Sequence, residues 1–491
     1  MIAAIVKPHV DWFTLAPSLT LIGVSGVLLL VAVLVPRRAR KPVSAVLAFA
    51  AFVGSFVFAI VLDDRSSRAA AQVHDAIFRD RWAALAQVLL AGCGAVAVLI
   101  SYRERMRDEH IAEYYALLTA AGAGMAFFVQ ASNLMTLFLG LEWFSIALYV
   151  LTAIDIDLIG SLEAGLKYLI VGAVGSATLL FGSALVYGIT GQLSFDRIAA
   201  AGHRHDAMLV VGLAMIVAGL GFKASAAPFH MWTPDAYQGA PTPVTAFMSS
   251  ATKIAALVVT YRVLTTAFPH DERLWTGAIA AIAIVSLAWG NIGALVQRNV
   301  KRILAYSSVS HAGFMLIGVA AANALGARAL IYYLVPYAAM SLGAFAVVAA
   351  RERELGVPVT LQNLAGLGWE RPFLGGSMWI FMLGMLGFPL TGGFFGKFYV
   401  FAAAYRHGWW WLIVAGVIAT MISAYYYLGI VRAMYFRETA ELQIAPVGGA
   451  PNPEVLLSAG VLICVVVTVG SFFAVQPLID VAKDAAGALP L

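Results

Sequence analysis

Apolar runs of about twenty residues make up most of this sequence, and short polar connections separate them. An α-helix needs roughly 20 such residues to cross the hydrocarbon core of a bilayer. We place fourteen runs of this kind near residues 13–35, 43–62, 83–101, 111–130, 132–153, 161–190, 208–226, 242–268, 274–297, 302–322, 326–350, 373–405, 409–435 and 454–476. The sequence therefore predicts an all-α polytopic membrane protein with about 14 transmembrane helices.

The composition agrees with this fold class and excludes others. Hydrophobic residues make up 62% of the 491 positions and charged residues only 12%, far from the balance of soluble domains. The net charge of +5 is spread along the chain, so no nucleic-acid partner is expected. The two cysteines, Cys93 and Cys464, lie in separate apolar runs, which favours neither a disulfide framework nor a metal site. We therefore expect the lipid bilayer as surroundings and no cofactor in this chain.

Two of the predicted helices are interrupted by proline. Residues 219–253 contain Pro228, Pro234 and Pro241, and a similar break with Pro389 spans residues 387–397. Proline breaks the backbone hydrogen bonds of a helix, and such a break is tolerated inside a membrane only where protein or water covers it. Many transporters build their central sites at broken helices of this kind. Both stretches are therefore predicted to line a hydrated cavity.

The two breaks lie five predicted helices apart, so equivalent helices would cross the membrane in opposite directions. This spacing is typical of an inverted repeat, here helices 4–8 against helices 9–13. It divides the chain into an N-terminal group of three helices (1–105), two five-helix repeats with one broken helix each (106–270 and 271–440) and a C-terminal helix (441–491).

The loops between the helices predict the orientation. Cytoplasmic loops of membrane proteins are enriched in lysine and arginine. One side holds 15 of the 31 basic residues, and the side with both termini holds 12. The first group comprises Arg37, Arg38, Arg40, Lys41, Arg103, Arg105, Arg107, Arg298, Lys301, Arg302, Arg351, Arg353, Arg371, Arg432 and Arg437. Both termini are therefore expected on the non-cytoplasmic side.

The count of loop residues leaves four basic residues for the interior of the predicted helices, and all four are lysine, although the chain has 23 arginines and 8 lysines. They are Lys167, Lys223, Lys253 and Lys397. Arginine stays protonated in proteins, whereas a lysine moved out of water can exchange its proton near neutral pH. We therefore expect these lysines to handle protons and expect every arginine to lie outside the membrane.

An acidic residue accompanies two of these lysines. Glu142 lies near the middle of the fifth predicted helix, where a charge is costly and usually functional, and Lys223 is its expected partner. The alternative is an ion pair that only holds two helices together. Lys167 follows Glu163 by four residues, so a surface ion pair there is as plausible as a proton site.

For the other candidate residues, a structural role is an alternative to a functional one. Lys253 could reach toward the membrane surface instead of staying buried, and Lys397 could be an interfacial anchor. His230 and His311 titrate near physiological pH, but a histidine on an apolar helix is more often a hydrogen-bonded core residue. Asp235 is expected to cap a turn or helix, which aspartate favours.

Three long segments resemble a known family. They are FKASAAPFHMWTPDAYQGAPTPVTAF (222–247), NVKRILAYSSVSHAGFMLIG (299–318) and GFPLTGGFFGKFYVF (387–401). In order and spacing they are similar to the antiporter-like membrane subunits of respiratory complex I, over about residues 106–435. Lysine at position 397 favours the N-type of this family, the counterpart of mitochondrial subunit 2, because sister subunits have glutamate there. Leu390 is a departure, since many relatives have a second proline at this position.

The resemblance implies a role for each candidate. Glu142 and Lys223 correspond to the family's glutamate–lysine pair, Lys253 to the central proton-carrying lysine and Lys397 to the last residue of the same axis. Lys167 matches an additional lysine, and His311 links the two halves. The resemblance also implies that the chain works in a bacterial cell membrane with other membrane subunits of complex I. NADH, FMN, iron-sulfur clusters and quinone then belong to partner subunits.

Two other functions use the same features. A subunit of a cation/proton antiporter would have the same helices without redox chemistry. A separate transporter for a small anion would need polar groups of substrate size at both breaks, where this sequence offers mainly lysines and aromatic residues.

Overall fold

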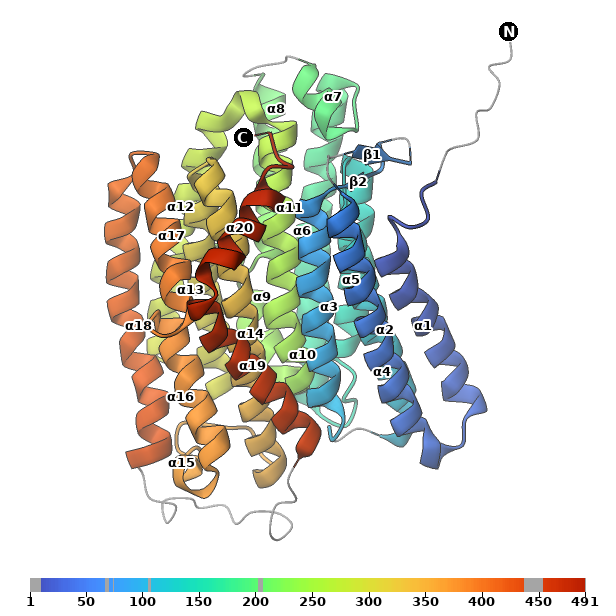
Figure 1. Ribbon diagram of the computed structural model, residues 1–491, viewed down its shortest axis with the longest axis vertical. Helices are drawn as coiled ribbons and strands as arrows, with labels where there is room; N and C mark the ends of the chain where they lie inside the picture. The colour runs from blue at the N-terminus through green and yellow to red at the C-terminus, as the bar shows by residue number, and fades with distance from the viewer. Residues whose placement is uncertain are drawn as a thin grey trace.

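The computed structural model describes residues 10–66, 70–73, 75–104, 107–201, 206–436 and 454–490. Arg105 and Arg437, and the predicted boundaries at 105/106 and 440/441, lie outside the described residues. The described chain is a bundle of long helices that run side by side (Figure 1). The helices are α1 (Ala16–Leu34), α2 (Arg37–Arg65), α3 (Arg81–Ser101), α4 (Ile111–Phe128), α5 (Leu134–Thr152), α6 (Ile159–Thr190), α7 (Phe195–Ala200), α8 (Ala207–Lys223), α9 (Trp232–Gly239), α10 (Thr242–Phe247), α11 (Lys253–Ala267), α12 (Glu272–Leu295), α13 (Val300–Ala320), α14 (Ala324–Leu355), α15 (Leu367–Glu370), α16 (Pro372–Leu386), α17 (Gly392–Arg406), α18 (Trp410–Phe436), α19 (Val455–Phe473) and α20 (Val475–Ala486).

Twelve helical stretches of the described chain are long and apolar enough to cross a membrane. This confirms the prediction of an all-α polytopic membrane protein. The other two predicted spans coincide with interrupted elements: the short helix α8 in one, and α16 and α17 in the other. The count of fourteen and the inverted repeat stay predictions.

The ends of the bundle carry the few elements that are not long helices. Strands β1 (Ala70–Gln72) and β2 (Ile77–Arg79) form an antiparallel hairpin at the same end as α7, whereas α15 lies at the opposite end (Figure 1). The start of α1 and the C-terminal end of α20 lie toward the end that carries α7 (Figure 1). The first and last described helices therefore begin and finish on the same side of the bundle.

The centre of the bundle consists of the stretch from α10 to α11, together with α13 and α14. In the most apolar part of each helical stretch, the share of buried residues is 100% for Thr242–Ala267, 94% for α13 and 89% for α14. Only a third are buried in α6 and α18, whose outward faces carry leucine and valine. Apolar side chains on the outside are expected of helices that face lipid. The central helices are those that hold Lys253 and His311.

The first break begins at the end of α8. The chain passes through Ser225, which has a φ of 59°, and a cis peptide bond before Pro228 to the short helix α9. Pro241 then precedes α10, where a missing backbone N–H does no harm because the first N–H groups of a helix have no helical partner. A π-helical turn, Met248–Thr252, joins α10 to α11. Two helix ends therefore lie inside the bundle.

The second break separates α16 from α17. Gly387 ends α16 with a φ of 85°, which glycine adopts without strain. Pro389 and Leu390 follow, and Leu390 has a φ of 74°. A proline ring fixes φ near −65°, so the second proline of many relatives could not adopt this conformation. Leucine at position 390 is therefore compatible with a backbone conformation that proline would exclude.

The expectation that no arginine lies inside the membrane is wrong. Arg262 lies in α11 and is 1% exposed. Its guanidinium donates two hydrogen bonds to the carboxylate of Asp80, at 2.6 and 2.7 Å, and one to the carbonyl of Val129. Asp80 also caps α3 by accepting from the backbone N–H of Ala83. A buried arginine is tolerated here because a carboxylate 182 positions earlier in the sequence neutralises it.

Replacing Arg262 with Met should destabilise the protein by about 3–5 kcal/mol, because Asp80 is left as an unpaired buried charge. The Arg262→Met, Asp80→Asn double variant should recover most of this loss, since asparagine keeps the cap of α3 without the charge. Denaturation midpoints of the purified protein in detergent measure both effects. A double variant no more stable than the single variant would contradict the proposed charge pairing.

Candidate functional site

Three lysines each bind the carbonyl group at the end of an interrupted helix. Lys253 donates to the carbonyl of Ala224, directly after α8, at 3.1 Å. Lys397 donates to the carbonyl of Leu386, the last residue of α16, at 2.9 Å. Lys301 donates to the carbonyl of Ala240, directly after α9, at 2.7 Å. The last carbonyls of a helix lack helical partners and carry a partial negative charge, so each break supplies an acceptor for an ammonium group.

Lys253 and Lys397 lie deep in the protein. Lys253 is completely buried, and Lys397 is 5% exposed. Lys397 also donates to the hydroxyl of Thr420 and lies 4.3 Å from the ring centre of Phe314. Neither side chain reaches the bundle surface, so the structure contradicts both the surface-reaching reading of Lys253 and the interfacial-anchor reading of Lys397.

Lys223 ends α8 inside a cage of aromatic rings. Its ammonium donates to the hydroxyls of Ser145, at 2.7 Å, and Tyr168, at 3.2 Å, and lies 4.7 Å from the ring centre of Phe144. Tyr168 stacks on Trp232 with ring centres 4.3 Å apart, which ties α6 to the first break. This cage holds the ammonium away from bulk water.

Glu142 lies on α5, one turn before Ser145. Within the described part of the chain, its carboxylate forms no direct ion pair with Lys223, and its Oε1 atom has no hydrogen-bond partner. The expected direct contact is therefore replaced by the Ser145 hydroxyl as the ligand of Lys223. A buried carboxylate oxygen without a partner is a site where water is expected.

His311 lies on α13 between two tyrosines. Its Nδ1 is 3.0 Å from the hydroxyl of Tyr333, and its Nε2 is 3.0 Å from the hydroxyl of Tyr427. The expectation of a hydrogen-bonded core histidine is correct for this residue. The sequence analysis did not find the two tyrosines, because a tyrosine in an apolar helix looks like any core residue.

His230, Pro228 and Pro234 lie in the first break, and Pro389 lies in the second. His230 is buried, as predicted for a core histidine, but its Nδ1 has no side-chain hydrogen-bond partner among the described residues, so the prediction of a hydrogen-bonded core residue is not confirmed at this nitrogen. Its ring packs against Trp289 and Tyr306. Pro234 lies inside α9, and Pro228 and Pro389 are exposed. Their role is to shape the chain path between the half-helices.

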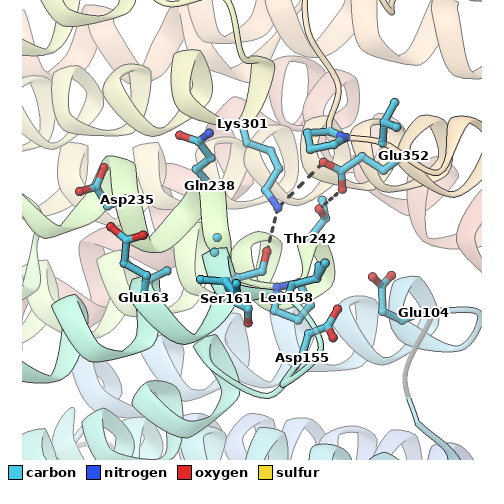
Figure 2. A pocket seen from close by; sticks show the side chains of 18 of the residues that line it. Glu104, Asp155, Leu158, Ser161, Glu163, Asp235, Gln238, Thr242, Lys301 and Glu352 are labelled. Carbon is cyan, nitrogen blue, oxygen red and sulfur yellow. Dashed lines mark hydrogen bonds and ion pairs between the residues drawn. The ribbon is translucent and has the colours of Figure 1, made fainter. Parts of the chain in front are cut away.

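A pocket of about 610 Å³ opens beside the first break and is also lined by the connection between α5 and α6 (Figure 2). Several carboxylates line it, including Glu104, Asp155 and Glu163. At the wall of the pocket, Lys301 Nζ lies 4.0 Å from Glu352 Oε1. Glu352 also accepts a short hydrogen bond from the hydroxyl of Thr242 at the start of α10. Sequence analysis placed Lys301 only in a loop and did not identify this contact.

Asp235 and Lys167 lie at the rim of the same pocket. Lys167 is 48% exposed and pairs with Glu163 at 2.6 Å and Asp235 at 3.2 Å, so the surface ion pair of the sequence reading is present. Asp235 also accepts from Arg302 at 2.6 Å and caps no helix, so the capping expectation is wrong. Burial opposes ionisation of Asp235, but the hydrogen bonds from Arg302 and Lys167 outweigh it and hold its pKa below the usual value. At the other side of the pocket, burial raises the pKa of Glu104 despite its ion pair with Arg353.

A membrane bundle with two broken helices, and a buried lysine bound at each break, is the architecture of an antiporter-type membrane protein. The sequence profile of the family described as "NADH:quinone oxidoreductase/Mrp antiporter, TM" matches residues 131–423. The chain belongs to this family. Its relatives include NADH-quinone oxidoreductase subunit N of Parvibaculum lavamentivorans, which is 41% identical over 404 residues, or 82% of either chain.

Two solved structures show that the fold alone does not distinguish a complex I chain from an Mrp chain. A chain of respiratory complex I from Thermus thermophilus is 30% identical and superposes with a TM-score of 0.79, covering 95% of this chain and 99% of that one. A chain of the Mrp complex from Dietzia sp. superposes with a TM-score of 0.82 at only 22% identity, covering 96% and 97%. The fold is thus common to both complexes, and it is the sequence that favours complex I subunit N.

The close approach of α16 and α17 at Gly393 holds Lys397 against the end of α16. A methyl group at position 393 would lie 1.9 Å from the carbonyl oxygen of Gly384. Gly393→Ala should therefore push the two helices apart and destabilise the protein by about 1–3 kcal/mol. Gly376→Ala on α16 is the matched control, because no atom lies within 4 Å of the added methyl group. Equal denaturation midpoints for the two variants would show that this contact does not hold the helices together.

Proposed function

We propose that the chain is the N-type proton-translocating membrane subunit of an NADH:quinone oxidoreductase. The observation that carries the proposal is the buried ammonium of Lys253, bound to the carbonyl that the first break leaves free. A lysine held in this way keeps a hydrogen bond whether it is protonated or neutral, since a neutral amine still has N–H donors. It can therefore release and regain a proton without leaving a buried carbonyl unpaired.

The proton path in this proposal starts at the pocket of Figure 2. Its carboxylates collect protons from the cytoplasmic side, and Lys253 receives them at the centre of the bundle. The proton then passes by way of His311 to Lys397 at the second break. The corresponding positions of Lys253 and Lys397, each bound to the end of a half-helix, support the assignment of residues 106–270 and 271–440 as inverted repeats.

Glu142 and Lys223 set the charge near the start of this path. Two unit charges about 5 Å apart interact by about 3 kcal/mol at an effective dielectric constant near 20. A change in the distance between Glu142 and Lys223 therefore alters how strongly the neighbouring lysine holds its proton. Quinone reduction elsewhere in the complex drives that change.

The partners follow from the same proposal. The chain contacts other membrane subunits of complex I and the lipid bilayer of the bacterial cell membrane, and it binds no nucleic acid. NADH, FMN, iron-sulfur clusters and quinone are bound by partner subunits, so this chain is a non-redox subunit of a translocase. Neighbouring genes for flavin and iron-sulfur subunits are expected, whereas neighbours encoding only antiporter subunits would favour the Mrp alternative.

Lys253→Ala should lower the number of protons that the assembled complex translocates per NADH oxidised, because the central carrier of this chain is lost. Lys253→Arg should lower it as well, since arginine keeps the charge but does not release the proton. Lys483→Gln is the control, and its translocation should stay close to that of the unmodified complex because Lys483 is exposed on α20 and does not line the pocket of Figure 2. Protons moved per NADH oxidised, measured in reconstituted vesicles, provide the test. An unchanged ratio in Lys253→Ala would exclude the carrier role.

The orientation can be tested with single cysteines, because both native cysteines are buried and unreactive toward impermeant reagents. Asp157 and Asp480 are exposed and lie on opposite sides in the proposed topology. Asp157→Cys should react with an impermeant maleimide only from the cytoplasmic side, and Asp480→Cys only from the other side. The reversed pattern would place both termini in the cytoplasm.

A further inference from the structure

His311 touches neither lysine of the proposed path. It is 1% exposed, and each of its ring nitrogens faces a tyrosine hydroxyl, Tyr333 on α14 and Tyr427 on α18. A proton can reach or leave an imidazole nitrogen only through the group to which that nitrogen is hydrogen-bonded. Any proton that uses His311 must therefore cross one of these two hydroxyls.

The hydrogen bonds continue beyond the histidine. The hydroxyl of Tyr427 also bonds the hydroxyl of Ser307, which lies one turn before His311 on α13. On the opposite side, the ring of Tyr333 packs against Gly396, the residue directly before Lys397. The four groups form a buried chain in the order Ser307, Tyr427, His311, Tyr333, which ends beside the second break.

The chemistry of the imidazole gives the two tyrosines complementary hydrogen-bond roles. A neutral imidazole has one N–H donor and one acceptor nitrogen, so one tyrosine must donate to the ring while the other accepts from it. Exchange of the two tautomers reverses both bonds at once. Each tyrosine hydroxyl is both donor and acceptor, so it can take part in either arrangement.

We propose that Tyr333 and Tyr427 are the residues that pass the proton on to and off His311. One hydroxyl gives its proton to the ring nitrogen that it faces, and the opposite ring nitrogen gives its proton to the other hydroxyl. The first hydroxyl then takes up a new proton on the side that faces away from the histidine. The second hydroxyl releases its extra proton on its own far side, so no group ends with a changed charge. Tyr333 is the link toward Lys397, and Tyr427 with Ser307 is the link on the other side. This inference rests on the proposed proton path.

Two other buried tyrosines provide matched controls within the chain. The hydroxyl of Tyr332 donates to the carbonyl of Ser471 at 2.8 Å, and that of Tyr261 to the carbonyl of Asn323 at 3.0 Å. Both are buried like Tyr333 and Tyr427, but neither bonds His311. Replacement by phenylalanine removes one buried hydroxyl in each of the four cases and keeps the ring. The controls therefore lose a hydrogen bond outside the proposed relay.

The test compares Tyr333→Phe and Tyr427→Phe with Tyr332→Phe and Tyr261→Phe in the whole complex reconstituted in vesicles. The first two should lower the number of protons translocated per NADH oxidised as much as Lys253→Ala does, and the two controls should leave it unchanged. The ratio is taken for assembled complex only, and passive proton leak is measured without NADH. A structural defect lowers assembly and NADH oxidation together but does not selectively lower this ratio. Should Tyr427→Phe not assemble, Ser307→Ala probes the same chain, and its ratio should fall too.

Two results would be decisive against the inference. If Tyr333→Phe and Tyr427→Phe translocate protons like their controls while Lys253→Ala does not, the tyrosine relay is wrong and the proposed function stands. If Lys253→Ala also translocates normally, the proposed function itself fails. A normal ratio in Ser307→Ala together with Tyr333→Phe likewise overturns the relay.

Discussion

The hydrogen bond from a lysine ammonium to the last carbonyl of an interrupted helix is the contact on which the rest of this structure depends. A helix that stops inside a bundle leaves carbonyl groups without partners, and each unpaired buried polar group costs about 1–3 kcal/mol. Lys253 and Lys397 bind such carbonyls at the two breaks. The break and the lysine therefore stabilise each other, since the break supplies an acceptor and the lysine satisfies it.

The charges of the central bundle fall into two groups. Arg262 is neutralised by Asp80, and Lys301 lies near Glu352. In the described part of the chain, Lys253 and Lys397 have no carboxylate in direct contact, only carbonyl and hydroxyl oxygens. In an ion pair, both side chains stay charged, because loss of the proton from the basic residue would leave the carboxylate as an unpaired buried charge. A lysine that is bound by neutral acceptors can lose its charge at smaller cost, which is what proton transfer requires.

Sequence reasoning succeeded where one residue type determines the local structure. Prolines and glycines located both breaks, and the placement of Lys253 and Lys397 inside apolar runs indicated buried ammonium groups. It failed where the deciding partner is distant in the sequence. Asp80 lies 182 positions from Arg262, and Arg302 lies 67 positions from Asp235. The expectations of an arginine-free membrane region and of a capping aspartate were wrong because neither contact leaves a local pattern.

The tyrosines around His311 show a second limit. Tyr333 and Tyr427 are 94 positions apart and lie in apolar helices, where tyrosine and phenylalanine give the same pattern. Only the positions of the hydroxyl groups in three dimensions separate Tyr427, which bonds the histidine, from Tyr426, which does not.

The half-helix ends, the buried lysines and the tyrosine-bound histidine of this chain are all formed within the chain itself, so these contacts need no particular source of energy. A different driving reaction has to act through the surfaces and charges that neighbouring subunits reach. In the proposed function Glu142 is a charge of this kind, because it lies near the aromatic cage of Lys223 without being fixed to it by a direct ion pair. A carboxylate held this loosely can respond to a neighbour, whereas the Arg262–Asp80 pair cannot.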